Sequence, residues 1–451
     1  MSGRDQQEAQ VAIIGAGFSG TMAAVQLARR GIDAVLIGGG AQAGKGVAYS
    51  TDDPSHLLNI PAAKMSAWPD QPDDFVAAIA DEGFGPEDYV PRMLFGRYLR
   101  QILDESAVRL VEGEAVAAER TGDGWTVRMG DGCAIRASAL VLAPGNQPPD
   151  ALPFAKDLPE RLFASDPWGA AGRATIAEAV RISGEGLGGG DVLAVGSGLS
   201  MIDVALSLDA AGHKGKLVAV SRRGQSPRAN FPLRGEVPSS DTAPSGSLAE
   251  LWRWVRRRTT EIDWRDAVDS VRSRTHELWQ SLSEADQKRF MRHARPWWDV
   301  HRHRIAPEVG TTVERRIASG RMEVLAGRIQ LLREADGGLE AVIWRRGMAE
   351  ADAPRHFAVG INCTGPLHAI AHTRDPVLRS LLDRGLAKPD LLGIGLKVDD
   401  QVRVIGSKRL WAMGSLGKAR YWEIIAVPDI RVQAEMVADA IARELNDEPE
   451  S

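Results

Sequence analysis

A glycine-rich segment close to the start of the chain constrains the fold more than any other feature of the sequence. Gly15-Ala16-Gly17-Phe18-Ser19-Gly20 follows the apolar run Val11–Gly15 and precedes an amphipathic segment that extends to about Arg30. A second apolar run, Ala34–Ile37, comes after it. This succession of strand, glycine turn, helix and strand predicts a βαβ unit of the kind that binds a dinucleotide.

Each glycine of this segment has a separate expected role. Gly15 allows a tight turn, Gly17 lets the backbone approach a pyrophosphate, and Gly20 lets the helix pack closely against the strand. The free N–H groups at the start of the helix, where Phe18 and Ser19 lie, then hold the phosphate charge. The alternative is a glycine-rich turn in another α/β fold.

The second strand of this unit lacks a feature that is common in such units. An acid usually ends that strand and binds the ribose hydroxyls. Here the strand continues into Gly38-Gly39-Gly40, without a carboxylate. We therefore expect other groups to hold the ribose, with the backbone as the first candidate.

A second glycine-rich segment occurs in the middle of the chain. Gly196-Ser197-Gly198-Leu199-Ser200-Met201 follows an apolar run and precedes a helical pattern that extends towards Ala211. Met201 takes the place of the third small residue, so helix and strand must be spaced differently here. The residues expected to contact a second dinucleotide are Gly196, Gly198, Leu199 and Ser200.

A basic pair follows the next expected strand, Leu217–Val220. Ser221-Arg222-Arg223 stands where a dinucleotide-binding unit meets the ribose. Guanidinium groups pair with a 2′-phosphate through charge-assisted, bidentate hydrogen bonds, so the pair favours NADPH over NADH. The alternative is two solvated arginines.

Two further apolar strands are expected to end in similar turns, at Leu140–Gly145 and at Ile361–Gly365. In flavoproteins with two dinucleotides, such strands carry the chain between domains beside the nucleotides. Gly145 and Gly365 are therefore candidate cofactor-binding residues. Alone, each turn would be an ordinary strand end.

The remaining segments differ in pattern. Short alternating runs broken by glycines predict an antiparallel meander over Arg109–Leu142. The segment Leu248–Arg304 is rich in Arg and Trp, and it predicts an inserted helical region. A last helix is expected from about Ile430 to Leu445.

Length, charge and cysteine content exclude several classes of protein. A chain of 451 residues predicts two or three domains. Its net charge of −5 gives no general attraction to nucleic acid or to anionic lipid. Cys133 and Cys363 are too distant to form a Cys-x-x-Cys redox pair or a thiolate metal site. A polar start and the absence of a long apolar run predict a cytoplasmic location.

Taken together, the motifs resemble a family of bacterial FAD/NAD(P)-binding proteins that is related to the class B, N-hydroxylating flavin monooxygenases. The resemblance spans nearly the whole chain. It rests on the two glycine-rich segments and on Gly44–Tyr49, His56–Ala62, Phe95–Leu99, Asp166–Trp168, Trp298–Arg304 and Trp422–Pro428.

This resemblance implies an α/β fold with two Rossmann-like dinucleotide-binding domains, one for FAD and one for NADPH. The first part of the FAD domain is expected at 1–165, the NADPH domain at 166–370 with a helical insert at about 245–310, and the C-terminal part of the FAD domain at 371–451.

The activity that the resemblance implies is a monooxygenase reaction. NADPH reduces FAD, oxygen adds to form a C4a-(hydro)peroxyflavin, and a small polar substrate is hydroxylated, with an amine nitrogen or an anionic substrate among the candidates. The rivals are an NADPH-oxidising flavin reductase or oxidase, and a non-catalytic flavin/NADPH redox sensor.

The resemblance also suggests residues beside the flavin. Asn59, Met65 and Trp68 are expected along the isoalloxazine ring, although a packed core loop is equally compatible with the segment Leu57–Met65. Gly414 and Ser415 are expected near the flavin pyrimidine, at the start of a helix. Val116 is also expected to contact the cofactor.

Two features of the helical region have competing interpretations. His301-Arg302-His303-Arg304 with Asp299 and Glu308 could bind a metal, but the flanking arginines would repel a cation, and we expect none. An anion site and a structural polar network both stay open. Six tryptophans between Trp252 and Trp298 are expected in the core, with a wall of a substrate pocket as the alternative.

Overall fold

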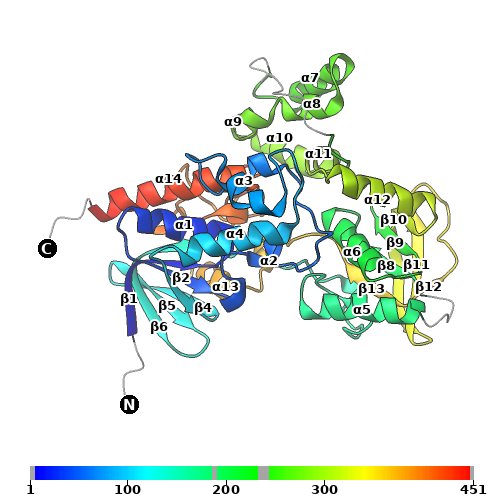
Figure 1. Ribbon diagram of the computed structural model, residues 1–451, viewed down its shortest axis with the longest axis horizontal. Helices are drawn as coiled ribbons and strands as arrows, with labels where there is room; N and C mark the ends of the chain where they lie inside the picture. Colours follow the sequence, from blue (N-terminus) through cyan, green and yellow to red (C-terminus); the bar gives the residue numbers. More distant parts are fainter. Residues whose placement is uncertain (1–5, 185–189, 232–242, 447–451) are drawn as a thin grey trace.

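The computed structural model describes residues 6–184, 190–231 and 243–446. They form two units, each built on its own β-sheet, with a group of helices that projects above the junction between them (Figure 1). The α/β fold class expected from the sequence is confirmed.

The first sheet has the strand order β3-β2-β1-β6-β5-β4, and β14 pairs with β6. Its strands are β1 (Gln6–Ile14), β2 (Ala34–Gly38), β3 (Arg109–Glu112), β4 (Ala115–Thr121), β5 (Gly124–Met129), β6 (Ala134–Leu142) and β14 (Leu410–Ala412). Strands β3, β2, β1, β6 and β14 pair in parallel, whereas β4, β5 and β6 pair antiparallel. The central parts of three parallel strands are buried and apolar, as buried parallel sheets require: Val11–Ile14, Ala34–Ile37 and Ala139–Leu142.

The expected antiparallel meander is wrong at its beginning. Arg109–Glu112 pairs in parallel with β2, and only the chain from Ala115 onwards forms the meander. A four-residue run shows too little of its period for the pattern to decide its direction.

Helices on the first sheet include α1 (Phe18–Arg29), which lies beside the C-terminal helix α14 (Val427–Asn446) and α4 (Arg92–Asp104) (Figure 1). The shorter helices of this unit are α2 (Gly46–Tyr49), α3 (Asp74–Ala78) and α13 (Pro376–Asp383). One hydrophobic core joins residues 11–143 with residues 370–441. The end of the chain therefore completes the unit that its beginning starts.

The second sheet has the order β12-β11-β10-β9-β8-β13-β7. Its strands are β7 (Phe163–Ala164), β8 (Val192–Val195), β9 (Leu217–Ser221), β10 (Met322–Ala335), β11 (Gly338–Arg345), β12 (Arg355–Phe357) and β13 (Val359–Asn362). Helices α5 (Ala170–Gly184), α6 (Leu199–Ala210) and α12 (Pro307–Ala318) accompany it. Because β7 belongs to this sheet, the second unit begins structurally before residue 166; the boundaries of the two cofactor domains stay predictions.

The inserted region is helical, as expected. It contains α7 (Leu248–Glu261), α8 (Trp264–Asp269), α9 (Thr275–Ser281), α10 (Glu284–Arg289) and α11 (Arg295–Arg302). Trp254 and Trp279 are buried in its two small cores, which agrees with the core interpretation. Trp297, by contrast, is 43% exposed. Across the described ranges, no helix is long and apolar enough to cross a membrane.

Candidate functional site

The first phosphate loop connects β1 to α1 at the centre of the first sheet. Gly15 has φ +106°, and a Cβ there would collide with the carbonyl oxygen of Ala143 at the end of β6. A Cβ on Gly20 would collide with the carbonyl oxygen of Gly15. Both positions therefore need glycine for the packing of the protein itself, which agrees with two of the three expected roles.

Gly17 is different, because protein packing leaves it open. A Cβ on Gly17 would meet only the Cα of Gly46, at an ordinary contact distance of 3.6 Å. Gly17 is also the N-cap of α1, and no side chain caps the helix. The start of α1 therefore has no capping side chain to satisfy its first N–H groups, which carry a partial positive charge and suit a pyrophosphate.

The C-terminal part of the chain returns to this loop. The hydroxyl of Ser19 lies 3.0 Å from the Cβ position of Gly414, which has φ +61°. The N–H of Gly414 donates to Oε1 of Gln433 at 2.8 Å, and the hydroxyl of Ser415 donates to the carbonyl oxygen of Gly145 at 2.7 Å. The structure thus brings together residues 19, 145 and 414, which were assigned separately from the sequence.

Glu112 supplies an acid beside the glycines that end the second strand. Glu112 at the end of β3 is paired in register with Gly38 at the end of β2. Its carboxylate lies 3.4 Å from the Cβ position of Gly40 and is exposed. Sequence reasoning missed Glu112 because it placed β3 in the meander. A parallel β3 would have revealed a carboxylate at the edge where the ribose is expected.

The second phosphate loop repeats the first in geometry. Gly196 has φ +109°, and a Cβ there would collide with the carbonyl oxygen of Cys363 at the end of β13, as Gly15 does with Ala143. Gly198 is the N-cap of α6 without a side-chain cap, and nothing lies within 4 Å of its Cβ position. Leu199 and Ser200 start the helix. Gly365, with φ +84°, has equally open surroundings.

The end of β9 is tied to this loop through serine hydroxyls. Ser197 donates to the hydroxyl of Ser221 at 2.8 Å and also contacts the carbonyl oxygen of Gln225. Arg222 is exposed, and the guanidinium of Arg223 lies 5.8 Å from the ring centre of Trp297. Within the described ranges, neither arginine has a carboxylate partner. Both are therefore available to an anionic group beside Gly198.

The residues expected along the flavin ring are placed as follows. The carbonyl oxygen of Asn59 accepts a hydrogen bond from Nδ2 of Asn230 at 3.1 Å, and Met65 is buried in the core of the first unit. Val116 lies at a bulge of β4, where the register shifts between Ala115 and Ala117. A bulge frees backbone groups from the ladder, which suits a cofactor contact.

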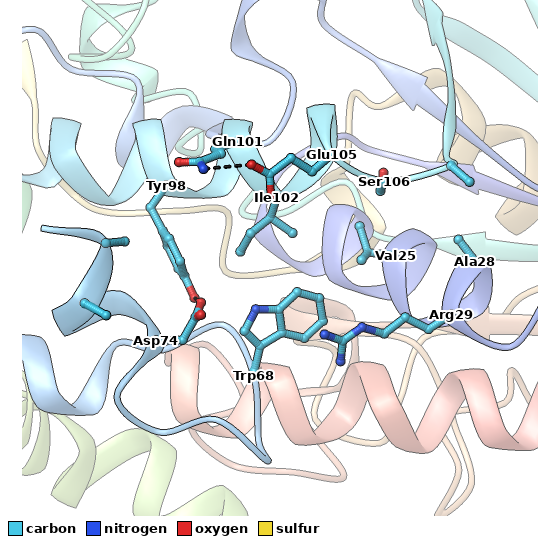
Figure 2. A pocket seen from close by; sticks show the side chains of 13 residues that line it. Val25, Ala28, Arg29, Trp68, Asp74, Tyr98, Gln101, Ile102, Glu105 and Ser106 are labelled. Carbon is cyan, nitrogen blue, oxygen red and sulfur yellow. Dashed lines mark hydrogen bonds between the residues drawn. The ribbon is translucent and has the colours of Figure 1, made fainter.

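Trp68 lies elsewhere. The guanidinium of Arg29, at the end of α1, stacks 3.5 Å from the ring centre of Trp68. Figure 2 shows both side chains on the wall of a cavity of about 530 Å³. This cavity faces the end of α1 opposite to Gly17, so the expected position of Trp68 beside a flavin is not supported.

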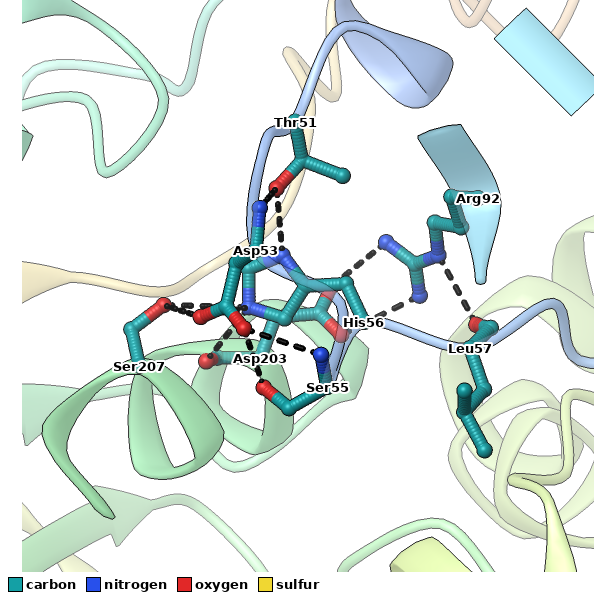
Figure 3. Close-up of polar contacts among 8 residues, drawn as sticks. All are labelled: Thr51, Asp53, Ser55, His56, Leu57, Arg92, Asp203 and Ser207. Atoms are coloured by element: carbon teal, nitrogen blue, oxygen red, sulfur yellow. Dashed lines mark hydrogen bonds and ion pairs between the residues drawn. The ribbon is translucent and has the colours of Figure 1, made fainter. Parts of the chain in front are cut away.

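A polar network joins the two units (Figure 3). Arg92 of α4 donates to both carboxylate oxygens of the buried Asp203 on α6, at 2.9 and 3.1 Å. The ring of His56 reaches the carbonyl oxygen of Asp203 and the hydroxyl of Ser207, at 3.1 and 3.0 Å. These contacts fix α6, and with it the second phosphate loop, against the first unit.

The two arginines of the segment His301–Arg304 are held in ion pairs, although Nε and Nη1 of Arg304 are buried without a hydrogen-bond partner in the described part of the chain. Arg302 pairs with the buried Glu423 at 2.8 Å, and Arg304 pairs with Asp269 at 2.6 Å. Glu423 itself has φ +70°, unusual for a residue with a side chain, and it also accepts from Nε1 of Trp298. Among the described residues, no three His, Cys, Asp or Glu side chains cluster as metal ligands would.

Next to this network lies a cation of unusual acidity. Burial and the nearby charge of Arg295 lower the pKa of Lys418 to about 8. Burial likewise lowers the pKa of His303 and of His368. Lys418 follows directly after the turn Gly414–Gly417, and Gly414 lies beside Ser19 of the first phosphate loop.

Comparisons with known proteins agree with this geometry. Residues 12–147 match the FAD-NAD(P)-binding family. A comparison with curated protein sequences finds no match. The fold is similar to the reduced ornithine hydroxylase of Pseudomonas aeruginosa, at 16% identity and a TM-score of 0.67 over 97% of this chain and 99% of that one.

Two other solved structures show how widely this fold is used. The ornithine N-hydroxylase of Kutzneria sp. 744, solved with reduced FAD, NADP⁺ and L-ornithine, is 14% identical with a TM-score of 0.67 (97% and 100% covered). A bacillithiol disulfide reductase from Bacillus cereus is 16% identical with a TM-score of 0.58 (97% and 100% covered). The chain therefore carries an FAD/NAD(P)-binding domain and has a flavoprotein oxidoreductase fold that serves hydroxylases and reductases alike.

Proposed function

We propose that the protein is an FAD- and NADPH-dependent monooxygenase that hydroxylates a small polar substrate, with an amine nitrogen as the favoured position. The observation that carries the proposal is the repeated phosphate loop. In each loop packing requires the first glycine, Gly15 or Gly196, and leaves room at the second, Gly17 or Gly198, which starts a helix without a side-chain cap.

FAD is assigned to the first loop. The N–H groups after Gly17 would hold the pyrophosphate, Glu112 would hold the ribose hydroxyls, and Gly414 would lie on the side of the flavin. When bound, the flavin supplies the redox chemistry: it takes two electrons from NADPH and activates oxygen, of which one atom enters the substrate and the other leaves as water.

NADPH is assigned to the second loop because of Arg222 and Arg223. The two guanidinium groups have no carboxylate partners in the described ranges, and they match a 2′-phosphate. A ribose without that phosphate would offer them no anion to bind. Replacing both with Gln should raise the NADPH Michaelis constant about 10- to 100-fold, the scale of one or two charged hydrogen bonds, and should leave NADH nearly unchanged.

The matched control is Arg181→Gln, which removes one exposed arginine that pairs with Glu178 on α5. It should leave both Michaelis constants unchanged. Equal losses for NADPH and NADH in the double variant would show that Arg222 and Arg223 hold the structure rather than the phosphate.

The positions of the two cysteines favour oxygen chemistry over disulfide reduction. Cys133 lies in the turn between β5 and β6, and Cys363 is buried at the end of β13, in the other sheet. Burial raises the pKa of the Cys363 thiol well above its usual range, which suppresses the reactive thiolate. A dithiol reaction centre therefore cannot form from the cysteines of this chain.

A product assay separates the proposed reaction from its rivals. Purified holoenzyme is given NADPH, oxygen and a panel of amines and amino acids, and the products are analysed by mass spectrometry and for hydrogen peroxide. A substrate should appear that gains one oxygen atom and suppresses peroxide release. Peroxide formed in equal amount to NADPH consumed, with every compound, would identify an oxidase instead.

A further inference from the structure

Trp297 lies on the outer side of the helical insert with its indole exposed. It belongs to the first turn of α11, next to Trp298, whose Nε1 donates to the buried Glu423. Successive residues of a helix point about 100° apart, so a helix that directs Trp298 towards this core directs Trp297 away from it. All twelve tryptophans lie in the described part of the chain, and Trp297, at 43%, is the most exposed of them.

Helix α11 is fixed beside the end of β9. The N–H of Arg228 donates to the carbonyl oxygen of Val300 at 3.0 Å, and its carbonyl oxygen accepts from the N–H of Ile305 at 3.0 Å. The chain that leaves β9 therefore runs against the end of α11. The guanidinium of Arg223 lies 5.8 Å from the ring centre of Trp297, within the range of a cation–π contact. These contacts hold the indole next to the basic pair Arg222-Arg223.

The indole lies where an adenine ring is expected if the basic pair holds a 2′-phosphate. The phosphate and the adenine are bonded to neighbouring carbon atoms of one ribose, so the ring cannot be far from the guanidinium groups that bind the phosphate. Trp297 offers a flat apolar surface at this place, beside Arg223. A base stacks on an indole through its π face, and the contact does not depend on the hydrogen-bonding edge of the base.

We propose that Trp297 is the residue on which the adenine of the nicotinamide cofactor stacks. The assignment rests on the proposed binding of a dinucleotide at the second phosphate loop, and it is independent of how oxygen reacts. Recognition is thereby divided between two groups. The indole recognises the adenine, which NADPH and NADH share, and Arg222 and Arg223 recognise the 2′-phosphate, which NADPH alone carries. The helical insert thus contributes a residue to the cofactor site.

Binding is tested by calorimetry on the oxidised holoenzyme, without turnover. The probes are NADP⁺ and adenosine 2′,5′-bisphosphate, which contains the adenine and the 2′-phosphate but no nicotinamide. Trp297→Ala should weaken the binding of both by about the same factor, roughly 10- to 100-fold, the scale of one lost stacking contact. Trp297→Phe should restore most of the affinity, because a phenyl ring also stacks. Equal binding of adenosine 2′,5′-bisphosphate to wild type and to Trp297→Ala would overturn the proposal.

Trp344→Ala is the matched control. Trp344 is a partly exposed tryptophan of β11, and the guanidinium of Arg328 lies 4.8 Å from its ring centre. Its replacement should leave the binding of both probes unchanged, and a loss as large as that in Trp297→Ala would contradict a specific role for Trp297. FAD content and the melting temperature confirm that each variant is folded. Trp297→Leu, which keeps apolar bulk without an aromatic face, replaces Trp297→Ala if that variant does not fold.

Flavin reduction separates the role of Trp297 from that of the basic pair. Trp297→Ala should raise the Michaelis constants of NADPH and NADH by the same factor, whereas the double variant Arg222→Gln/Arg223→Gln should raise that of NADPH alone. Reduction by reduced nicotinamide mononucleotide, which has no adenine, should be unchanged in Trp297→Ala. A similar loss with this mononucleotide would show that the indole acts through the fold and not on the adenine.

Failure of this assignment and failure of the proposed function give different results. If Trp297→Ala weakens nucleotide binding but wild type never oxygenates a compound, the role of Trp297 stands and the monooxygenase assignment falls. If wild type binds neither NADP⁺ nor adenosine 2′,5′-bisphosphate, the cofactor assignment of the second loop falls, and the role of Trp297 falls with it.

Discussion

Replacing one glycine in each phosphate loop should remove one cofactor at a time while leaving the fold intact. In Gly17→Val the side chain enters space that the protein leaves empty, since a Cβ there meets only Gly46 at 3.6 Å. In Gly198→Val the Cβ meets nothing within 4 Å. Both glycines are N-caps whose replacement costs the helix no more than about 1 kcal/mol.

The effect on binding is much larger than the effect on folding. A valine at either position occupies the place of the pyrophosphate and blocks about two charged hydrogen bonds from helix N–H groups, each worth about 1.5–3 kcal/mol. The loss of about 3–6 kcal/mol corresponds to an affinity that is about 10²- to 10⁴-fold weaker. Gly17→Val should thus purify colourless, whereas Gly198→Val should stay yellow but be reduced by NADPH only at much higher concentration.

The assay combines the flavin absorbance of the purified protein, thermal unfolding, and stopped-flow reduction by NADPH. Gly15→Ala is the contrasting variant. Gly15 has φ +106°, and a Cβ there collides with the carbonyl oxygen of Ala143, so this variant should be unstable with or without FAD. A Gly17→Val protein that retains full FAD would refute the assignment of the first loop. Flavin loss in Gly198→Val would show that the two loops do not bind separate cofactors.

Three further predictions follow from the geometry. Glu112→Gln should weaken FAD binding about 10-fold in an equilibrium titration, and unchanged affinity would remove Glu112 from the ribose site. Asp203→Asn should lower stability by about 3–5 kcal/mol, because the largely buried guanidinium of Arg92 loses its carboxylate partner between the units, and a wild-type unfolding curve would contradict this. Because burial and Arg295 lower its pKa, Lys418 loses its proton as the pH rises through about 8, so its modification by an amine-reactive reagent should show a midpoint there. A midpoint near the ordinary lysine value of about 10.4 would show that Lys418 is solvated.

The loops were predictable from the sequence because their glycines answer local requirements. Gly15 and Gly196 must turn sharply beside a neighbouring strand, and only glycine tolerates that backbone. The turns that end at Gly145 and Gly365 were identified as well. The sequence did not predict which residues the loop glycines approach. Gly15 lies against the carbonyl oxygen of Ala143, and Gly196 lies against that of Cys363, each just before one of those turns.

The remaining parts of the site depend on tertiary contacts without a sequence signal. Glu112 was missed because the direction of a four-residue strand is set by its neighbours. The contact between Arg92 and Asp203 joins residues 111 positions apart. Such pairs leave no periodic pattern, since each consists of single charged residues whose partners are chosen by the fold.

The most direct test of the proposed reaction is the reoxidation of the reduced enzyme in a stopped-flow spectrometer. Enzyme reduced by NADPH, with NADP⁺ still bound, is mixed with oxygenated buffer, and the absorbance is followed from the reduced to the oxidised flavin. We expect a transient species, a flavin–oxygen adduct, that absorbs at shorter wavelength than oxidised flavin and decays faster when a substrate is present. Direct, monophasic return to oxidised flavin, with or without NADP⁺ and with every amine and amino acid tested, would contradict the monooxygenase assignment.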